Sequence, residues 1–176
     1  SSVSYLGVDT DFFKPLKTKK DIDILFVGSG EFTDGFDLLK DALKSVKHNI
    51  NLETTIGKRR KYVDDKTLRD LYRRAKIVIC AARDEPFGMI PLEAMAVGAV
   101  IIAVNEGGYR ESIIDNTSGF LVERNDKKLA RKIDWVLDNP KKAEEIGRNA
   151  RQIIVVDWNW KKRAKELEIK IIDFLK

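Results

Sequence analysis

A nearly unbroken apolar stretch between Glu85 and Asn105 constrains this chain more than any other feature of its sequence. Every residue between those two is apolar, glycine or proline, with the single exception of Glu93. The stretch contains an Ala- and Met-rich run that is typical of a packed helix, followed by Val100 to Val104, which is typical of a buried strand. A carboxylate is costly to bury without a partner. Glu93 therefore needs a specific reason to be there.

The residues from Phe87 to Pro91 are typical of a loop that turns into the start of a helix. Gly88 lets a ligand approach the backbone, and a proline is tolerated in a first turn because its missing N–H is not needed there. The N–H groups of residues 88 to 90 are then free, and a helix start of this kind favours phosphate. Glu85 and Glu93 flank this start, where each can accept hydrogen bonds from hydroxyls. The pattern predicts a site for a polyhydroxylated phosphate ester.

The spacing alone also allows a simpler interpretation. Glu93 is equally well placed as a first-turn glutamate that the helix dipole favours, and Glu85 as an exposed loop charge. Short motifs carry a false-positive risk, so the residues by themselves leave both interpretations open.

A longer pattern resembles a known family. Glu-Pro-Phe-Gly-x-x-Pro-x-Glu-Ala-Met-Ala, which begins at Glu85 and is followed by Gly107-Gly108-x-x-Glu111, resembles the group 1 (family 4-like) retaining glycosyltransferases, which have two Rossmann-like domains in the GT-B fold. The segment from Tyr5 to Pro15 is similar to the one that opens the C-terminal domain in that family. The resemblance implies that residues 1–176 are one Rossmann-like donor-binding domain, with a linker at 1–20 and a C-terminal helix at 157–176. The N-terminal acceptor domain would be absent.

This resemblance implies a reaction and a set of site residues. The reaction is transfer of a hexose from a nucleoside-diphosphate sugar to an acceptor hydroxyl with retention at the anomeric carbon, without a metal or other cofactor. Glu85 would be the catalytic residue, beside the anomeric carbon, and Glu93 would bind the ribose hydroxyls. The other implied donor-binding residues are Phe87, Gly88, Met89 and Ile90 along the sugar and diphosphate, Gly28 and Ser29 in an upstream loop, and Tyr62 and Val63 at the nucleobase. The expected acceptor is a glycan or a lipid-linked sugar.

The glycine pair Gly28 and Gly30, which follows a predicted strand, is where the chain departs from the family. Alone, Gly-x-Gly is a weak indication of a phosphate loop, and a tight turn is the simpler interpretation. At the positions of Ser29 and Asp34 the family carries an arginine and a lysine that hold the diphosphate. An aspartate there would repel a diphosphate. The departure leaves donor binding at this loop open.

Two hypotheses answer this departure. The basic cluster at 58–61 could supply the missing positive charge through Arg59 and Arg60, although a basic run is usually a solvated turn. Alternatively, the chain is a catalytically degenerate domain that binds a nucleotide or a partner chain.

The alternation of strand and helix patterns predicts the fold class without the family. It indicates an α/β domain with an open parallel, Rossmann-like sheet and helices on both faces. The predicted strands are 21–27, 51–57, 77–81, 100–104 and 120–123, and the predicted helices include 35–46, 65–75, 110–115, 127–137, 141–154 and one from 160 onward. A chain of 176 residues with 43% hydrophobic content suits one domain with a full core.

Composition limits the partners and the compartment. A net charge of +5 permits an anionic partner such as a nucleotide sugar, a phospholipid surface or nucleic acid. We do not expect nucleic acid, because no recognition motif for it is present. The single cysteine, Cys80, is expected in the core, and Asp9-Thr10-Asp11 is expected to form a turn and no metal site. Without a membrane-length apolar run or a signal-peptide pattern, we expect a cytoplasmic protein, peripheral to a membrane at most.

Overall fold

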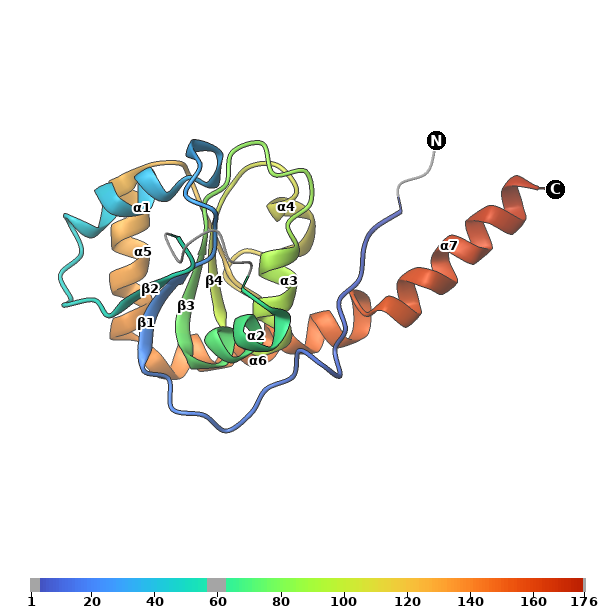
Figure 1. Ribbon diagram of the computed structural model, residues 1–176, viewed down its shortest axis with the longest axis horizontal. Helices are drawn as coiled ribbons and strands as arrows, with labels where there is room; N and C mark the ends of the chain where they lie inside the picture. The colour runs from blue at the N-terminus through green and yellow to red at the C-terminus, as the bar shows by residue number, and fades with distance from the viewer. Residues whose placement is uncertain (1–3, 57–62, 176) are drawn as a thin grey trace.

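One open parallel sheet forms the centre of the molecule, in a computed structural model that describes residues 4–56 and 63–175 (Figure 1). The strands follow the order β2-β1-β3-β4-β5, and each neighbouring pair is parallel. They are β1 (Ile22–Phe26), β2 (Leu52–Thr54), β3 (Ala75–Cys80), β4 (Val100–Val104) and β5 (Phe120–Val122). Because all five are parallel, their carboxyl ends meet at one edge of the sheet, where open α/β sheets bind ligands.

Helices cover both faces of this sheet, as the sequence predicted. Helices α1 and α5 pack against each other on one face, and α2 and α3 pack on the other, while α6 contacts α3, α5 and β4 (Figure 1). Their bounds are α1 (Phe36–Leu43), α2 (Asp65–Arg74), α3 (Met89–Ala96), α4 (Tyr109–Ser112), α5 (Asp126–Asp138), α6 (Pro140–Asp157) and α7 (Trp160–Phe174), with a short 3-10 helix η1 (Phe32–Asp34) before α1.

Apolar runs without alternation explain the central strands. All five residues of β4 are buried, as are five of the six in β3. A parallel strand covered by helices on both faces has no solvent side, so it reads as a continuous run of Val, Ile and Ala. Cys80, at the end of β3, is buried in this core, as predicted.

Most predicted elements appear within a few residues of their expected bounds, and the differences have local causes. Helix α1 ends at Leu43 rather than at residue 46, because the N–H groups of Lys44 and Ser45 bond to carbonyls three residues back in a tighter turn. Strand β2 is shorter than predicted, at three residues.

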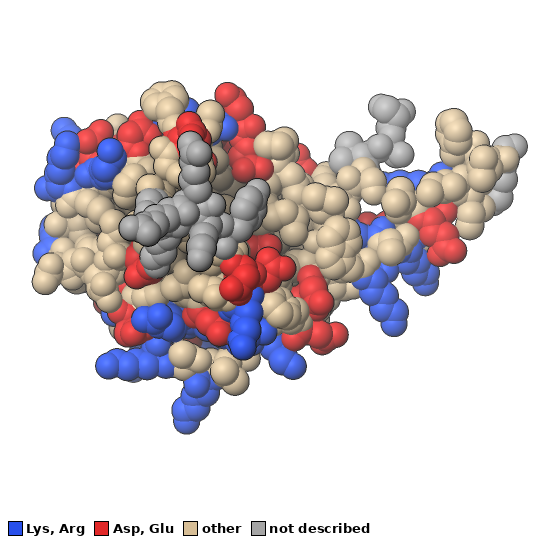
Figure 2. Space-filling view, viewed as in Figure 1, with Lys and Arg blue, Asp and Glu red and all other residues tan. Residues whose placement is uncertain are grey.

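The segment around Val8 lies beside the turn between α6 and α7. The N–H of Val8 donates to the carbonyl of Trp158 at 2.8 Å, and Val8 also pairs with Asn159 in an isolated bridge. Helix α7 then projects away from the body (Figure 1), and none of its residues is buried. Figure 2 shows charged side chains on the lower side of this projecting helix and uncharged ones on its upper side. Its exposed apolar residues include Leu167, Ile169, Ile171, Ile172 and Phe174, and the exposed Leu175 follows directly after it.

Candidate functional site

The start of α3 has the geometry that the sequence predicted for it. The helix begins at Met89, and Gly88 before it adopts the left-handed conformation, with φ of 92°. A Cβ at Gly88 would lie 3.0 Å from the Tyr109 ring, so this position suits only glycine. Among the described residues, no side chain caps this helix start. The N–H groups of its first turn have no partner within the helix.

A pair of glycines holds the loop before α3 in place. The N–H of Gly108 donates to the carbonyl of Glu85 at 2.9 Å. A Cβ at Gly107 would lie 2.4 Å from that same carbonyl, and one at Gly108 would lie 2.4 Å from the Cα of Phe87. Only glycines permit so close a backbone contact. The side chain of Glu85 is half-buried, and its Oε1 accepts the N–H of Phe87 at 3.3 Å.

Glu93 is a half-buried carboxylate with one specific partner. The hydroxyl of Tyr72, a fully buried residue of α2, donates to Glu93 Oε2 at 3.0 Å. Burial raises the pKa of Glu93 to about 7, the nearby Asp65 also raises it, and the bond from Tyr72 opposes the change. The apolar sequence around Glu93 is consistent with this burial, which the spacing alone left open. Its partner was not predicted, because Tyr72 lies 21 positions earlier in the sequence.

The loop after β1 is organised by Asp34. The N–H groups of Ser29 and Gly30 donate to Asp34 Oδ2 at 2.7 and 2.8 Å, and the N–H of Glu31 reaches the same oxygen at 3.2 Å. The Ser29 hydroxyl adds a contact of 2.8 Å. Meanwhile the N–H of Gly28 donates to Thr55 Oγ1 at 2.9 Å. The interpretation as a plain tight turn missed this internal carboxylate.

Arg83 fastens the η1 segment of that loop to the end of β3. Its guanidinium forms a two-point pair with Asp37, at 3.0 and 2.7 Å, and lies 3.8 Å from the centroid of the Phe32 ring. Its backbone N–H donates to the carbonyl of Thr33 at 2.7 Å. Nothing in the sequence marked Arg83 as functional beyond its position two residues before Glu85.

A second arginine, Arg124, ties the end of β5 to the end of β3. It donates to both carboxylate oxygens of Glu106, with the shortest contact at 2.6 Å, and to the carbonyls of Ala81 and Ala82. Arg83 and Arg124 therefore each have a carboxylate partner, and each holds a loop around the site.

Three of the predicted donor-binding residues lie outside the described residues: Tyr62, expected at the nucleobase, and Arg59 and Arg60, expected to supply positive charge to the diphosphate. Val63 is half-buried and packs against the core just before α2. Its predicted contact with a nucleobase stays a prediction.

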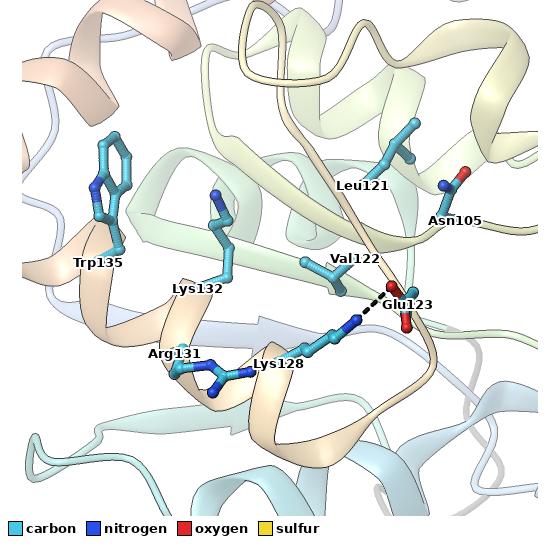
Figure 3. Close-up of a pocket in the computed structure, with 8 residues that line it drawn as sticks. All are labelled: Asn105, Leu121, Val122, Glu123, Lys128, Arg131, Lys132 and Trp135. Atoms are coloured by element: carbon cyan, nitrogen blue, oxygen red, sulfur yellow. Dashed lines mark ion pairs between the residues drawn. The ribbon is translucent and has the colours of Figure 1, made fainter.

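A separate hollow of about 450 Å³ lies between β5 and α5 (Figure 3). It is lined by Asn105, Leu121, Val122, Glu123, Lys128, Arg131, Lys132 and Trp135. Lys128 forms an ion pair with Glu123 across it. It contains no residue of the motif between Glu85 and Glu93, so it is distinct from the candidate site.

In the described part of the chain, no group of three or more His, Cys, Asp or Glu side chains is arranged to hold a metal ion. Asp9 forms a turn, as predicted, because its Oδ1 accepts the N–H groups of Asp11 and Phe12. Across the described residues, no helix combines the length and the apolar character needed to cross a membrane.

Comparison with known proteins points to one family. The family described as Glycosyl transferases group 1 matches residues 60–153, which is more than half of the chain. An uncharacterized glycosyltransferase of Methanocaldococcus jannaschii is 30% identical over 166 residues, covering 81% of this chain and 43% of that protein. A glycogen synthase of Mycobacterium tuberculosis is 34% identical over 100 residues, covering 56% of this chain and 24% of that protein. The chain thus spans less than half the length of these relatives.

Solved structures share the fold. Sucrose-phosphate synthase from Thermosynechococcus elongatus matches with a TM-score of 0.85 at 20% identity, covering 99% of this chain and 52% of that one. Anabaena HepE, solved in complex with UDP, matches with a TM-score of 0.86 at 16% identity, covering 98% of this chain and 57% of that one. The prediction of an open parallel sheet of the glycosyltransferase type is confirmed.

Proposed function

Because this chain belongs to the group 1 glycosyltransferase family, we propose that it is the donor-binding part of a retaining hexosyltransferase. In the proposed reaction, a hexose passes from a nucleoside-diphosphate sugar to an acceptor hydroxyl, with the anomeric configuration retained. The observation that carries the proposal is a helix start at the carboxyl edge of the sheet that no described side chain caps, with Glu85 in the loop before it and Glu93 just after its first turn. The complexes of Anabaena HepE with UDP and with UDP-glucose support the ligand class.

Glu93 is proposed to bind the ribose. A carboxylate can accept two hydroxyl hydrogen bonds, and Tyr72 holds this one in a single orientation through Oε2. Because the pKa of Glu93 is raised, the free carboxyl is partly protonated near neutral pH. Hydrogen bonds from ribose hydroxyls favour its charged form. Affinity should therefore rise as the pH passes upward through about 7.

Glu85 is proposed to act at the sugar. The bond from Gly108 to its carbonyl, together with the contact from the N–H of Phe87 to its side chain, fixes where the carboxylate lies. From there it would accept hydrogen bonds from hexose hydroxyls beside the anomeric carbon. The residues from Phe87 to Ile90 would meet the sugar and diphosphate through their backbone.

The departing diphosphate needs electrostatic stabilisation, which the uncapped start of α3 can supply in part. We propose that no metal is required. Full activity in the presence of EDTA, measured on the protein that includes its acceptor-binding half, would support this part of the proposal.

The acceptor site is proposed to belong to a part of the protein beyond this chain. The chain's coverage of 43% of a curated relative supports this, as do the exposed apolar residues of α7, which a second domain could cover. The proposed acceptor is a glycan or a lipid-linked sugar, reached in the cytoplasm at or near a membrane surface. The basic charge is the only support for the membrane, and sedimentation with anionic vesicles tests it.

The decisive experiment is calorimetric titration of this chain with UDP, GDP and ADP, with and without their sugars, on wild type and on Glu93→Ala. One nucleotide should bind, and the variant should lose at least about tenfold in affinity, as expected for a lost charge-assisted hydrogen bond. Glu145→Ala, an exposed position of α6, changes the net charge equally and should bind like wild type. Equal affinity of Glu93→Ala and wild type for the nucleotide would overturn the proposed ribose site.

A second candidate function is favoured by Asp34. Its carboxylate occupies the loop after β1 where the family resemblance places basic side chains. The chain would then be a catalytically degenerate domain that binds a nucleotide or a partner without transferring sugar. Turnover by the protein that includes its acceptor-binding half separates the two functions, because only the transferase releases free nucleotide.

A further inference from the structure

The loop after β1 already contains an anion. Successive N–H groups from Ser29 to Glu31 converge on one oxygen of Asp34, with contacts from 2.7 to 3.2 Å. Convergence of consecutive backbone N–H groups is how such loops hold phosphate oxygens. In this chain the oxygen that they hold is covalently part of the loop.

The carboxylate also fills the available space. A Cβ at Gly28 would lie 2.9 Å from Asp34 Oδ2, so the side chain sits directly over the glycine backbone. A phosphate oxygen that approached these N–H groups would meet a filled position and a like charge at hydrogen-bond range.

Neighbouring contacts keep Asp34 from turning away easily. The next residue, Gly35, has φ of 75°, and a Cβ there would lie 1.9 Å from the carbonyl of Ala81. The preceding residue, Thr33, accepts the N–H of Arg83 at 2.7 Å. The backbone on both sides of Asp34 is thus fastened to the end of β3.

We infer that Asp34 excludes the diphosphate of the donor from the loop after β1, which makes it a specificity-determining residue of the site. The identity of the ligand rests on the proposed function. The donor is then held by its nucleoside and sugar, near Glu93 and Glu85, and by the start of α3. Removal of the carboxylate turns residues 28 to 31 into an open anion-binding loop.

The test follows the amide resonances of Ser29, Gly30 and Glu31 by NMR while inorganic pyrophosphate is added. The proteins are wild type, Asp34→Ala and Asp41→Ala. Asp41 is an exposed carboxylate of α1 that pairs with Lys44, so its variant has the same change in net charge at a different place. Should Asp34→Ala fail to fold, Asp34→Asn takes its place, with a weaker response in the same direction.

In wild type and in Asp41→Ala, pyrophosphate should leave these resonances unchanged, whereas in Asp34→Ala they should shift and saturate. Saturable shifts in wild type would overturn the inference, because the loop would then be open. Absence of any response in the folded Asp34 variant would overturn it as well, because the loop would then have no affinity for anions.

Calorimetry with nucleotides extends the test. Asp34→Ala should bind the nucleoside diphosphate at least about tenfold more tightly than wild type, and should bind the nucleoside with unchanged affinity. If no nucleotide binds to any variant, the proposed function fails, and the pyrophosphate titration still decides whether Asp34 closes the loop.

Discussion

Two neighbouring loops at the carboxyl edge of the sheet use their carboxylates in opposite ways. The loop after β1 directs Asp34 inward, onto its own backbone N–H groups. The loop after β3 and the helix that follows it keep Glu85 and Glu93 half-buried, beside a helix start that no described side chain caps. The first loop satisfies its donors internally, and the second leaves its donors for a ligand.

The difference shows that the partner of an acidic residue decides its role. Asp34 has several backbone donors within reach, whereas Glu93 has one hydroxyl donor, that of Tyr72. Charge alone would have assigned both residues the same effect on an anionic ligand. Because of these contacts, Asp34 stabilises its own loop, whereas Glu93 is a candidate ligand-binding group.

The largest effects are expected at the glycines that pack each loop onto its neighbour. Gly35→Ala should lower the free energy of unfolding by about 3 kcal/mol or more, because both a left-handed φ and a clash with the Ala81 carbonyl oppose the new Cβ. Gly107→Ala should do the same to the other loop, through the carbonyl of Glu85. Urea unfolding measures both.

Gly98→Ala is the matched control for these two variants. Gly98 also has a positive φ, of 78°, but its nearest neighbour to a new Cβ would be 3.7 Å away. Gly98→Ala should lower the free energy of unfolding only by the backbone strain of an alanine at this φ, about 1 kcal/mol. Equal losses in all three variants would show that close packing of the loops contributes nothing.

The raised pKa of Glu93 predicts how stability depends on pH. Its pKa is about 7 in the folded state against a usual 4.5, so between these values the folded chain holds a proton that the unfolded chain has lost. Stability should therefore fall as pH rises through this window, by on the order of 3 kcal/mol, and level off above it. Between pH 4 and pH 8, the free energy of unfolding of wild type should fall by this amount more than that of Glu93→Gln. Parallel curves would contradict the prediction.

Tyr72→Phe should have a smaller effect on stability and a specific effect on the pKa of Glu93. Loss of the hydroxyl removes the bond that favours the charged carboxylate, so the pKa of Glu93 should rise further, with a stability loss of about 1 kcal/mol. Carbon NMR of the Glu93 carboxyl measures the change. Tyr109→Phe, at a tyrosine whose ring lies against Gly88, should leave the Glu93 titration unmoved.

The smallest effects should be local ones at the two arginines. Arg83→Met loses the pair with Asp37, so hydrogen exchange of the Ser29 and Gly30 amides should quicken while that of Gly108 stays slow. Arg124→Met loses the bonds to Glu106 beside the Gly107–Gly108 pair, and should show the reverse pattern. Equal changes in both loops for either variant would show that the loops are not held separately.

Much of the fold could be read from the sequence because local patterns and burial agree. Uninterrupted apolar runs predicted the central strands, and β4 has the predicted bounds. Gly88 and Pro91 likewise indicated the start of α3, because their backbone requirements are local. The ends of short elements were less accurate, since they depend on single hydrogen bonds.

The site could be predicted only where its residues are close in sequence. The motif from Glu85 to Glu93 was recognised in the sequence, and the role of these two residues in donor binding stays a prediction. The bond from Tyr72 to Glu93 and the pairing of Arg83 with Asp37 join residues 21 and 46 positions apart, which no local pattern reveals.

The sequence by itself determined the α/β class, the order of the elements, the family and the two candidate glutamates, because periodicity and motif spacing are properties of neighbouring residues. Only the tertiary structure decided that Asp34 turns into its own loop and that Glu93 is partly withdrawn from water. Both depend on which donors and how much apolar surface surround a carboxylate once distant segments have packed, and that packing also sets the free energy of its charge.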